Sequence, residues 1–311
     1  MTAFNELRGR LTLPLIAAPM FLVSGPDLVV AAARAGIVGA FPTANARDVG
    51  ELARWLTDIR DRREPGRGAV AANLIVHHSN SRMREDLAVL CDQPTELVIT
   101  SVGSPAPVVD ALHEVGALVF ADIATLRHAR RAVAAGADGL ILLTAGAGGQ
   151  TGWANPFAFV RSVREFYDGP LVLAGGISDG VALRAAFTLG ADLGYMGTKF
   201  LATTESLAPR EHKQMVVDSE LDDITLTSAL TGLPTNMLRP SLDRGLDPNT
   251  SGPDGADVSG LLAQAGSSSP WRNFFSAGHS AGGVQDILSV AELVERTAYE
   301  YRGLFQRADG P

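Results

Sequence analysis

Short apolar runs alternate with amphipathic stretches from residue 13 to about residue 201. The run at 139–143, Gly-Leu-Ile-Leu-Leu, contains no polar residue, which is typical of a strand covered on both faces. The runs predicted as strands are 13–19, 38–41, 69–76, 97–101, 118–123, 139–143, 171–174 and 193–196. The amphipathic stretches predicted as helices are 27–35, 48–60, 82–91, 107–115, 125–135, 156–167 and 180–189.

Eight such β/α units predict a closed (β/α)8 TIM barrel of the α/β class, with its active site at the carboxyl ends of the strands. An open, doubly wound sheet is the alternative. It is disfavoured because glycine-rich turns follow several different strands, whereas an open sheet binds its ligand at one switch point. The pattern therefore directs attention to the residues that end each strand.

The regular alternation stops after residue 201. A helix at 209–217 is predicted as the eighth barrel helix, and a mixed segment follows at 225–238. Residues 239–269 are rich in Gly, Ser, Pro and Asp around one short helical patch at 258–265, and a final amphipathic helix is expected at 284–302. We therefore expect a barrel over 1–217 and a C-terminal extension over 218–311 that closes on it; whether 239–269 is a lid or a dimer arm is left open.

Composition limits the classes of partner. The formal net charge is −8 and no run of Lys or Arg occurs, which argues against nucleic acid. The single cysteine, Cys91, excludes an internal disulfide and is expected to be a buried helical thiol. No signal segment and no apolar run of about 18 residues is present, so a cytoplasmic protein that does not bind membranes is expected, and no metal site is predicted.

The stretch 144–152, Thr-Ala-Gly-Ala-Gly-Gly-Gln-Thr-Gly, directly follows a predicted buried strand. Its glycines permit positive φ angles and a close approach of a flat ligand to the backbone. Gln150 is the one large functional side chain in it. A flexible connection is the alternative interpretation, but so many glycines after a buried strand favour a binding loop.

Two further glycine-rich turns end the last predicted strands. Gly175-Gly176 follows the seventh strand and Gly197-Thr198 the eighth, where barrels of this type commonly bind a phosphate. Backbone N–H groups of such turns, together with the Thr198 hydroxyl, form a suitable anion site. Tight turns without a ligand are the alternative.

Polar side chains at other strand ends complete the predicted cavity. Asn73 lies within an apolar strand, so it is either a core amide bonded to backbone or a contact to the edge of a heteroaromatic ring. Pro19-Met20 ends the first strand, and Ser101 and Ser104 flank the end of the fourth. All are candidates to line the barrel mouth.

These motifs together resemble the nitronate monooxygenase family, formerly called 2-nitropropane dioxygenase, which is close to the FMN-dependent enoyl-carrier-protein reductases. The strings that carry the resemblance are AAPM at 17–20, AGAGGQTG at 145–152, AGGISDG at 174–180, MGTKFLATTES at 196–206 and WRNFFSAGH at 271–279. The likeness extends over essentially the whole chain.

The resemblance implies a barrel that binds FMN without a covalent bond. The implied cofactor-binding residues are Ala18, Pro19, Met20, Asn73, Ser101, Gly148, Gly175, Gly176, Tyr195, Met196, Gly197 and Thr198. The implied reaction is oxidation of a small-molecule substrate, an alkyl nitronate, by O2 to a carbonyl compound and nitrite. Related enzymes use NAD(P)H to reduce enoyl thioesters or quinones, and a homodimer is possible.

Two departures from the family pattern bear on the reaction. Gln150 occupies the place of the family's histidine, the expected base, and an amide cannot take a proton. Oxidation of a preformed nitronate remains possible, and the alternatives are an NAD(P)H-dependent flavin reductase and a flavin-binding protein that has lost catalysis.

Asp122 stands where several members carry lysine, so its side chain is expected to point elsewhere or to meet a cation. His279, in Ser-Ala-Gly-His-Ser, is the replacement acid or base, with a solvent-exposed histidine as the alternative.

Overall fold

Eight parallel strands close into a barrel, in the order β1-β2-β3-β4-β5-β6-β8-β9, so the predicted (β/α)8 barrel is confirmed. The computed structural model describes residues 2–230, 232–250, 252 and 273–308. The barrel strands are β1 (Leu15–Ala17), β2 (Val38–Pro42), β3 (Ala69–Ile75), β4 (Leu97–Ser101), β5 (Leu118–Ile123), β6 (Gly139–Leu143), β8 (Leu171–Ala174) and β9 (Leu193–Met196). Closure is made by β1 and β9, where Ile16 pairs with Tyr195.

The barrel interior is filled by alternate strand residues. Ile16 faces the interior core, whereas Leu15 and Ala17 face the layer of helices, as the two-residue period of a strand requires. Helix α1 (Ala3–Gly9), which the apolar pattern did not predict, adds Phe4 to the interior core, with its ring centroid 5.9 Å from that of Phe120. The barrel is therefore a packed core, and open space is left only toward its ends.

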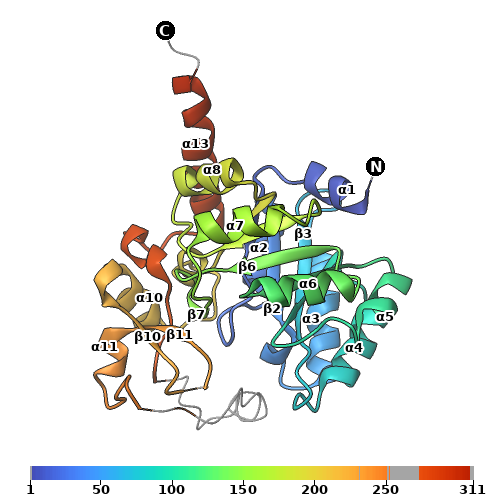
Figure 1. Ribbon diagram of the computed structural model, residues 1–311, viewed down its shortest axis with the longest axis horizontal. Helices are drawn as coiled ribbons and strands as arrows, with labels where there is room; N and C mark the ends of the chain where they lie inside the picture. Colours follow the sequence, from blue (N-terminus) through green and yellow to red (C-terminus); the bar gives the residue numbers. More distant parts are fainter. Residues whose placement is uncertain (1, 231, 251, 253–272, 309–311) are drawn as a thin grey trace.

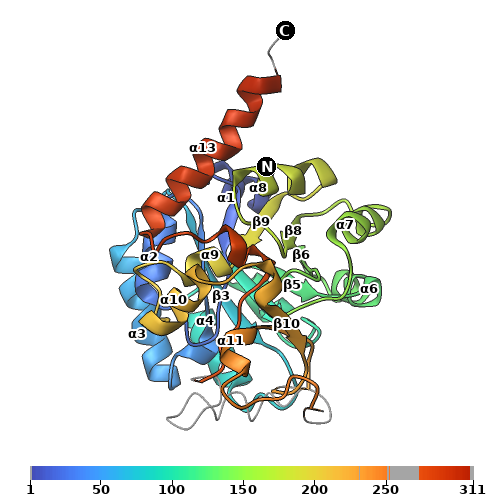
Figure 2. The ribbon, with the colours of Figure 1, turned by 90° about the vertical axis from the view of Figure 1, so that its left-hand side faces the viewer.

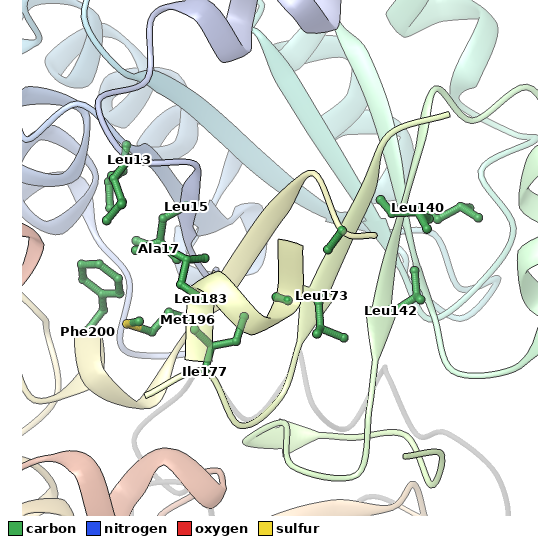
Figure 3. Packing of buried hydrophobic residues seen from close by; sticks show 14 of the residues in the cluster. Leu13, Leu15, Ala17, Leu140, Leu142, Leu173, Ile177, Leu183, Met196 and Phe200 are labelled. Carbon is green, nitrogen blue, oxygen red and sulfur yellow. The ribbon is translucent and has the colours of Figure 1, made fainter. Parts of the chain in front are cut away.

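Helices surround the strands, as Figure 2 shows. They are α2 (Pro26–Arg34), α3 (Val49–Arg62), α4 (Met83–Asp92), α5 (Val109–Glu114), α6 (Leu126–Ala134), α7 (Pro156–Arg164) and α8 (Gly180–Leu189). Several begin at a side-chain cap: Asp48, Thr125 and Asp179 each accept a hydrogen bond from a backbone N–H three residues later. Leu140, Leu173 and Leu183 belong to one cluster of buried residues between the strands and the helices (Figure 3).

The place of the eighth barrel helix is taken by α13 (Val290–Ala308), which packs against both α8 and α2. The backbone N–H of Gly180 donates to Glu300 of α13, and a Cβ on Gly180 would collide with the backbone of Tyr301. The helix predicted for this place forms as α10 (Arg210–Val217) but lies elsewhere, near residues 276–283. Residues between β9 and α13 are thus inserted before the last helix of the ring, which sequence periodicity alone does not reveal.

A second, three-stranded antiparallel sheet covers the carboxyl ends of the barrel strands. Its order is β10 (Ile224–Thr227), β11 (Thr235–Leu238), β7 (Gly149–Gln150), so the glycine-rich stretch contributes an edge strand. Figure 1 shows α10, α11 (Arg239–Leu242), β10 and β11 together beside β7. The insertion also contains α9 (Thr198–Leu201), η2 (Leu221–Asp223) and η4 (His279–Gly283), while η1 (Thr43–Asn45) follows β2. The predicted patch at 258–265 lies outside the described residues.

Two further features concern the membrane and the single cysteine. No helix within the described ranges is long and apolar enough to cross a membrane. Cys91 is half-buried, not fully buried, and burial raises the pKa of its thiol.

Candidate active site

A cavity of about 580 Å³ opens at the carboxyl ends of the barrel strands. The strand ends form one wall, which we call the floor, and the inserted segments form the opposite wall, which we call the roof. Roof residues are largely apolar; they include Leu207, Pro209, His212, Leu233, Phe274, Phe275 and Ser276. The cavity thus has a polar, glycine-rich floor and an apolar roof.

The residues predicted to bind the cofactor converge on this cavity, with one exception. Ala18, Pro19, Met20, Asn73, Ser101, Gly148, Gly175, Gly176, Tyr195, Gly197 and Thr198 all line it. The Met196 side chain instead packs in the outer core near Phe200 (Figure 3), so this residue can contribute to a cofactor site only through its backbone. The Met196 carbonyl accepts a hydrogen bond from the Ala18 N–H at 2.9 Å, so this residue supports the site through its backbone.

The glycines of 144–152 accommodate the chain's own backbone. A Cβ at Gly148 would lie 2.6 Å from the amide nitrogen of Gly278, and one at Gly152 would collide with the Leu143 carbonyl. Only Gly149 among them has a positive φ, +64°. At least two of these glycines, Gly148 and Gly152, are therefore needed for close packing of the chain against the roof segment and the strand end. This revises the expectation that the glycines chiefly admit a flat ligand.

Asn236, on β11, fastens the roof to this glycine-rich stretch. Its side-chain nitrogen donates to the carbonyls of Ala145 and Ala147 at 3.0 and 2.7 Å, and lies 3.4 Å from the Thr151 hydroxyl. The residue is 2% exposed. Sequence reading missed Asn236 because it lies in the segment 225–238, which showed no clear period.

The glycine turn after β8 has an exposed backbone toward the cavity. Gly175 and Gly176 have φ angles of +115° and +75°, which side chains rarely adopt. A Cβ on Gly176 would meet no atom within 4 Å, so its backbone borders open space. Thr198, on the neighbouring turn, accepts a hydrogen bond from the Gly278 N–H at 2.9 Å and keeps its own hydroxyl proton for another acceptor.

Asn73 keeps one functional atom for a ligand. Its side-chain nitrogen donates to the Ile99 carbonyl and to the Ser101 hydroxyl, both at 3.0 Å. Its side-chain oxygen accepts no hydrogen bond from any described residue. Both sequence interpretations therefore hold in part: the amide is anchored in the core, and it presents an acceptor to the cavity.

Backbone strain is concentrated at the cavity. Leu22 and Val102 have φ angles of +60° and +56°, a region that residues with a Cβ seldom occupy, and both line the cavity. The Leu22 N–H donates to Asn45, whose side-chain nitrogen donates to the carbonyls of Met20 and Ser24. This network holds the β1–α2 loop in its strained form at the mouth.

Asp122 lines the cavity floor without a partner, contrary to the sequence expectation. Its Oδ1 is fully enclosed and forms no hydrogen bond with any described residue, and no cation pairs with it. Burial raises the pKa of Asp122 to about 7. The adjacent Tyr195 is also buried, and burial together with the Asp122 charge raises the pKa of its phenol well above the usual value.

His212 is a cavity residue that sequence reading assigned to the outer helical layer. It lies on α10 in the roof, where its ring stacks on Phe275 with centroids 4.4 Å apart. Its Nε2 lies 3.0 Å from the Ser276 carbonyl, which can only accept, so Nε2 carries a proton. Burial lowers the pKa of His212 to about 4, so the imidazole is neutral and its Nδ1 is an acceptor.

The two residues predicted to be catalytic are placed differently. Gln150 lines the cavity from β7 with an exposed side chain. His279 also has an exposed side chain, but it does not line the cavity; its backbone N–H donates to the Gly146 carbonyl. The His279 ring lies beside the cavity wall, with its Nδ1 3.3 Å from where a Cβ on cavity-lining Gly146 would lie, and its role as acid or base stays a prediction.

A TIM barrel with such a cavity at its strand ends has the architecture of an enzyme. The family model described as nitronate monooxygenase matches residues 56–299. The chain therefore belongs to the nitronate monooxygenase family and is an oxidoreductase.

Individual relatives agree with this assignment. A nitronate monooxygenase of Pseudomonas aeruginosa is 28% identical over 96% of this chain and 99% of its own length. A (3aS,4S,5R,7aS)-5-hydroxy-7a-methyl-1-oxo-octahydro-1H-indene-4-carboxyl-CoA dehydrogenase of Rhodococcus jostii is 29% identical over 95% of this chain and 80% of its own. Among solved structures, FabK from Thermotoga maritima superposes with a TM-score of 0.85 at 26% identity, covering 98% of this chain and 97% of that one. A nitroalkane oxidase from Streptomyces ansochromogenes gives 0.81 at 27% identity, covering 99% and 100%.

Proposed function

We propose that this protein is an FMN-dependent oxidoreductase that oxidises preformed alkyl nitronates with O2 to a carbonyl compound and nitrite. The observation that carries the proposal is the convergence of the predicted cofactor residues, from separate strand ends, on one cavity. When bound, the flavin would supply the electron transfer, which protein side chains cannot provide.

The floor fits the two ends of FMN. Gly176 and Thr198 offer a backbone N–H and a hydroxyl to the phosphate, where the open side of Gly176 leaves room. The free side-chain oxygen of Asn73 suits a ring N–H, and Met20 and Gly148 border the same space. Each of these groups matches a donor, an acceptor or an apolar face of the cofactor.

The roof and Gln150 act on the substrate. The apolar side chains of Leu233 and Phe275 line the roof, so they would shield a substrate bound beneath them from water and strengthen its polar contacts. The Gln150 amide can donate a hydrogen bond to an oxygen of a nitronate and orient it, but it cannot remove a proton from a neutral nitroalkane. A nitronate is already deprotonated, so this site needs no base to oxidise it.

A second candidate is NAD(P)H-dependent reduction, through the flavin, of the activated C=C bond of an enoyl thioester or enone or of a quinone; the reverse reaction would oxidise the saturated acyl thioester. Two similarities favour it: the likeness to the Rhodococcus CoA-ester dehydrogenase and that to FabK, both over nearly the whole chain. The apolar roof would also accept an acyl chain.

Anaerobic mixing of the flavin-loaded protein with propyl-2-nitronate, NADH or NADPH tests the two candidates. We expect the nitronate alone to bleach the visible flavin absorbance, and aerobic turnover to release nitrite. Bleaching by NADH or NADPH, with none by the nitronate, would replace the first candidate by the second. No bleaching by any of the three would contradict both.

A further inference from the structure

We propose that Asp122 is a neutral carboxylic acid that donates a hydrogen bond to an acceptor atom of the bound flavin ring. This inference rests on the proposed function, because the bound flavin would be the hydrogen-bond partner that no described residue provides for Asp122. Asp122 lies at the end of β5, between β4 and β6, where Asp122 pairs with Ile141 and the neighbouring β4 position is Ser101.

The proposal starts from the missing partner. The enclosed Oδ1 has no hydrogen bond with any part of the chain that the structure describes, although nearly all buried polar atoms in proteins have one. The other carboxyl oxygen, Oδ2, also has no hydrogen-bond partner among the described residues, but it is not one of the enclosed atoms, and Asp122 is only partly buried where it lines the cavity. Oδ2 is therefore the oxygen that an atom of a ligand in the cavity can reach.

The charges around Asp122 determine its protonation state. Arg and Lys residues are absent from the cavity lining, whose titratable members among the described residues are Asp122, Tyr195 and His212. Tyr195 and His212 are both neutral at physiological pH. With no cation from the described residues lining the cavity, an ionised carboxylate would be uncompensated, so the proton is retained and the group is a donor below about pH 7.

The protonation state gives the pH dependence its direction. Asp122 changes from a hydrogen-bond donor to an anion that repels negative charge on the ring as it loses its proton. Flavin affinity should therefore fall as the pH rises through about 7, the pKa that burial gives to Asp122. The midpoint potential should fall as well, because reduction places additional negative charge on the ring.

The test compares FMN dissociation constants at pH 6 and pH 8.5 for the wild type and Asp122→Asn, whose amide keeps a donor at both values. We expect wild-type affinity to fall at least tenfold more than that of the variant between the two pH values. The titration of the FMN phosphate itself is common to both proteins and cancels in this comparison.

A second readout needs no cofactor. Infrared difference spectra of the apoprotein should show a protonated carboxylic acid that titrates near pH 7 in the wild type and is absent in Asp122→Asn. Equal pH dependence of FMN affinity in the two proteins, or no such infrared signal, would overturn this inference alone. Failure of FMN to bind at either pH would overturn the proposed function together with it.

Discussion

Replacing Gln150 by histidine should give this protein activity on neutral nitroalkanes. We expect kcat/KM for nitroethane to rise by about 100-fold or more, because a positioned general base contributes roughly 10²–10⁴-fold. Gln150 is exposed, so an imidazole at this position should keep a pKa near the ordinary value of about 6.5 and be available as a base at pH 7. The rate should increase with pH through that value.

Preformed ethyl nitronate is the control substrate, because it is already deprotonated and its oxidation needs no base. Activity of Gln150→His on preformed ethyl nitronate should stay within a few-fold of wild type, whereas Gln150→Leu, which keeps the size but loses the amide, should reduce it. Initial-rate measurements with both substrates separate the two roles. An unchanged rate on nitroethane, with FMN still bound, would show that proton removal does not depend on residue 150.

Replacing Asn236 by alanine should destabilise the protein and detach the roof from the glycine-rich stretch. The change leaves the Ala145 and Ala147 carbonyls without their donor. Each unsatisfied buried acceptor costs about 1–3 kcal/mol, so we expect the free energy of unfolding to fall by about 2–4 kcal/mol. Urea denaturation measures this loss.

Asn249 provides the matched control, since it is an exposed asparagine whose hydrogen bonds within the described residues reach only Asp247. Asn249→Ala should change the free energy of unfolding by less than about 0.5 kcal/mol. Hydrogen exchange should show faster amide exchange at 144–151 in Asn236→Ala but not in Asn249→Ala. Equal stability of the two variants would contradict the anchoring role of Asn236.

The barrel was predictable because its strands are nearly continuous apolar runs with glycine turns after them. The same signal located most of the floor, since residues such as Asn73 and Gly176 directly end or interrupt a strand. The side to which the Met196 side chain points was not predictable, because consecutive strand residues face opposite sides and the motif at 195–198 does not show which side is the cavity.

The roof was much less predictable, because it depends on contacts distant in sequence. β7 is only two residues long and exists through pairing with β11, some 85 residues later. His212 fits an amphipathic helix equally well against the barrel or over the cavity, and its stacking on Phe275 decides between them. Asp122 was expected to avoid a cofactor on grounds of charge, an argument that does not apply to a protonated carboxyl.

The most direct test of the account is the cofactor content of the purified protein. Acid release followed by chromatography should yield FMN, and not FAD, at about one molecule per chain. The same preparation should show the visible absorbance of a protein-bound flavin, and this absorbance should be lost from a Gly176→Leu variant, whose side chain would extend into the cavity. A folded wild-type protein that contains no flavin and does not bind added FMN would contradict the account.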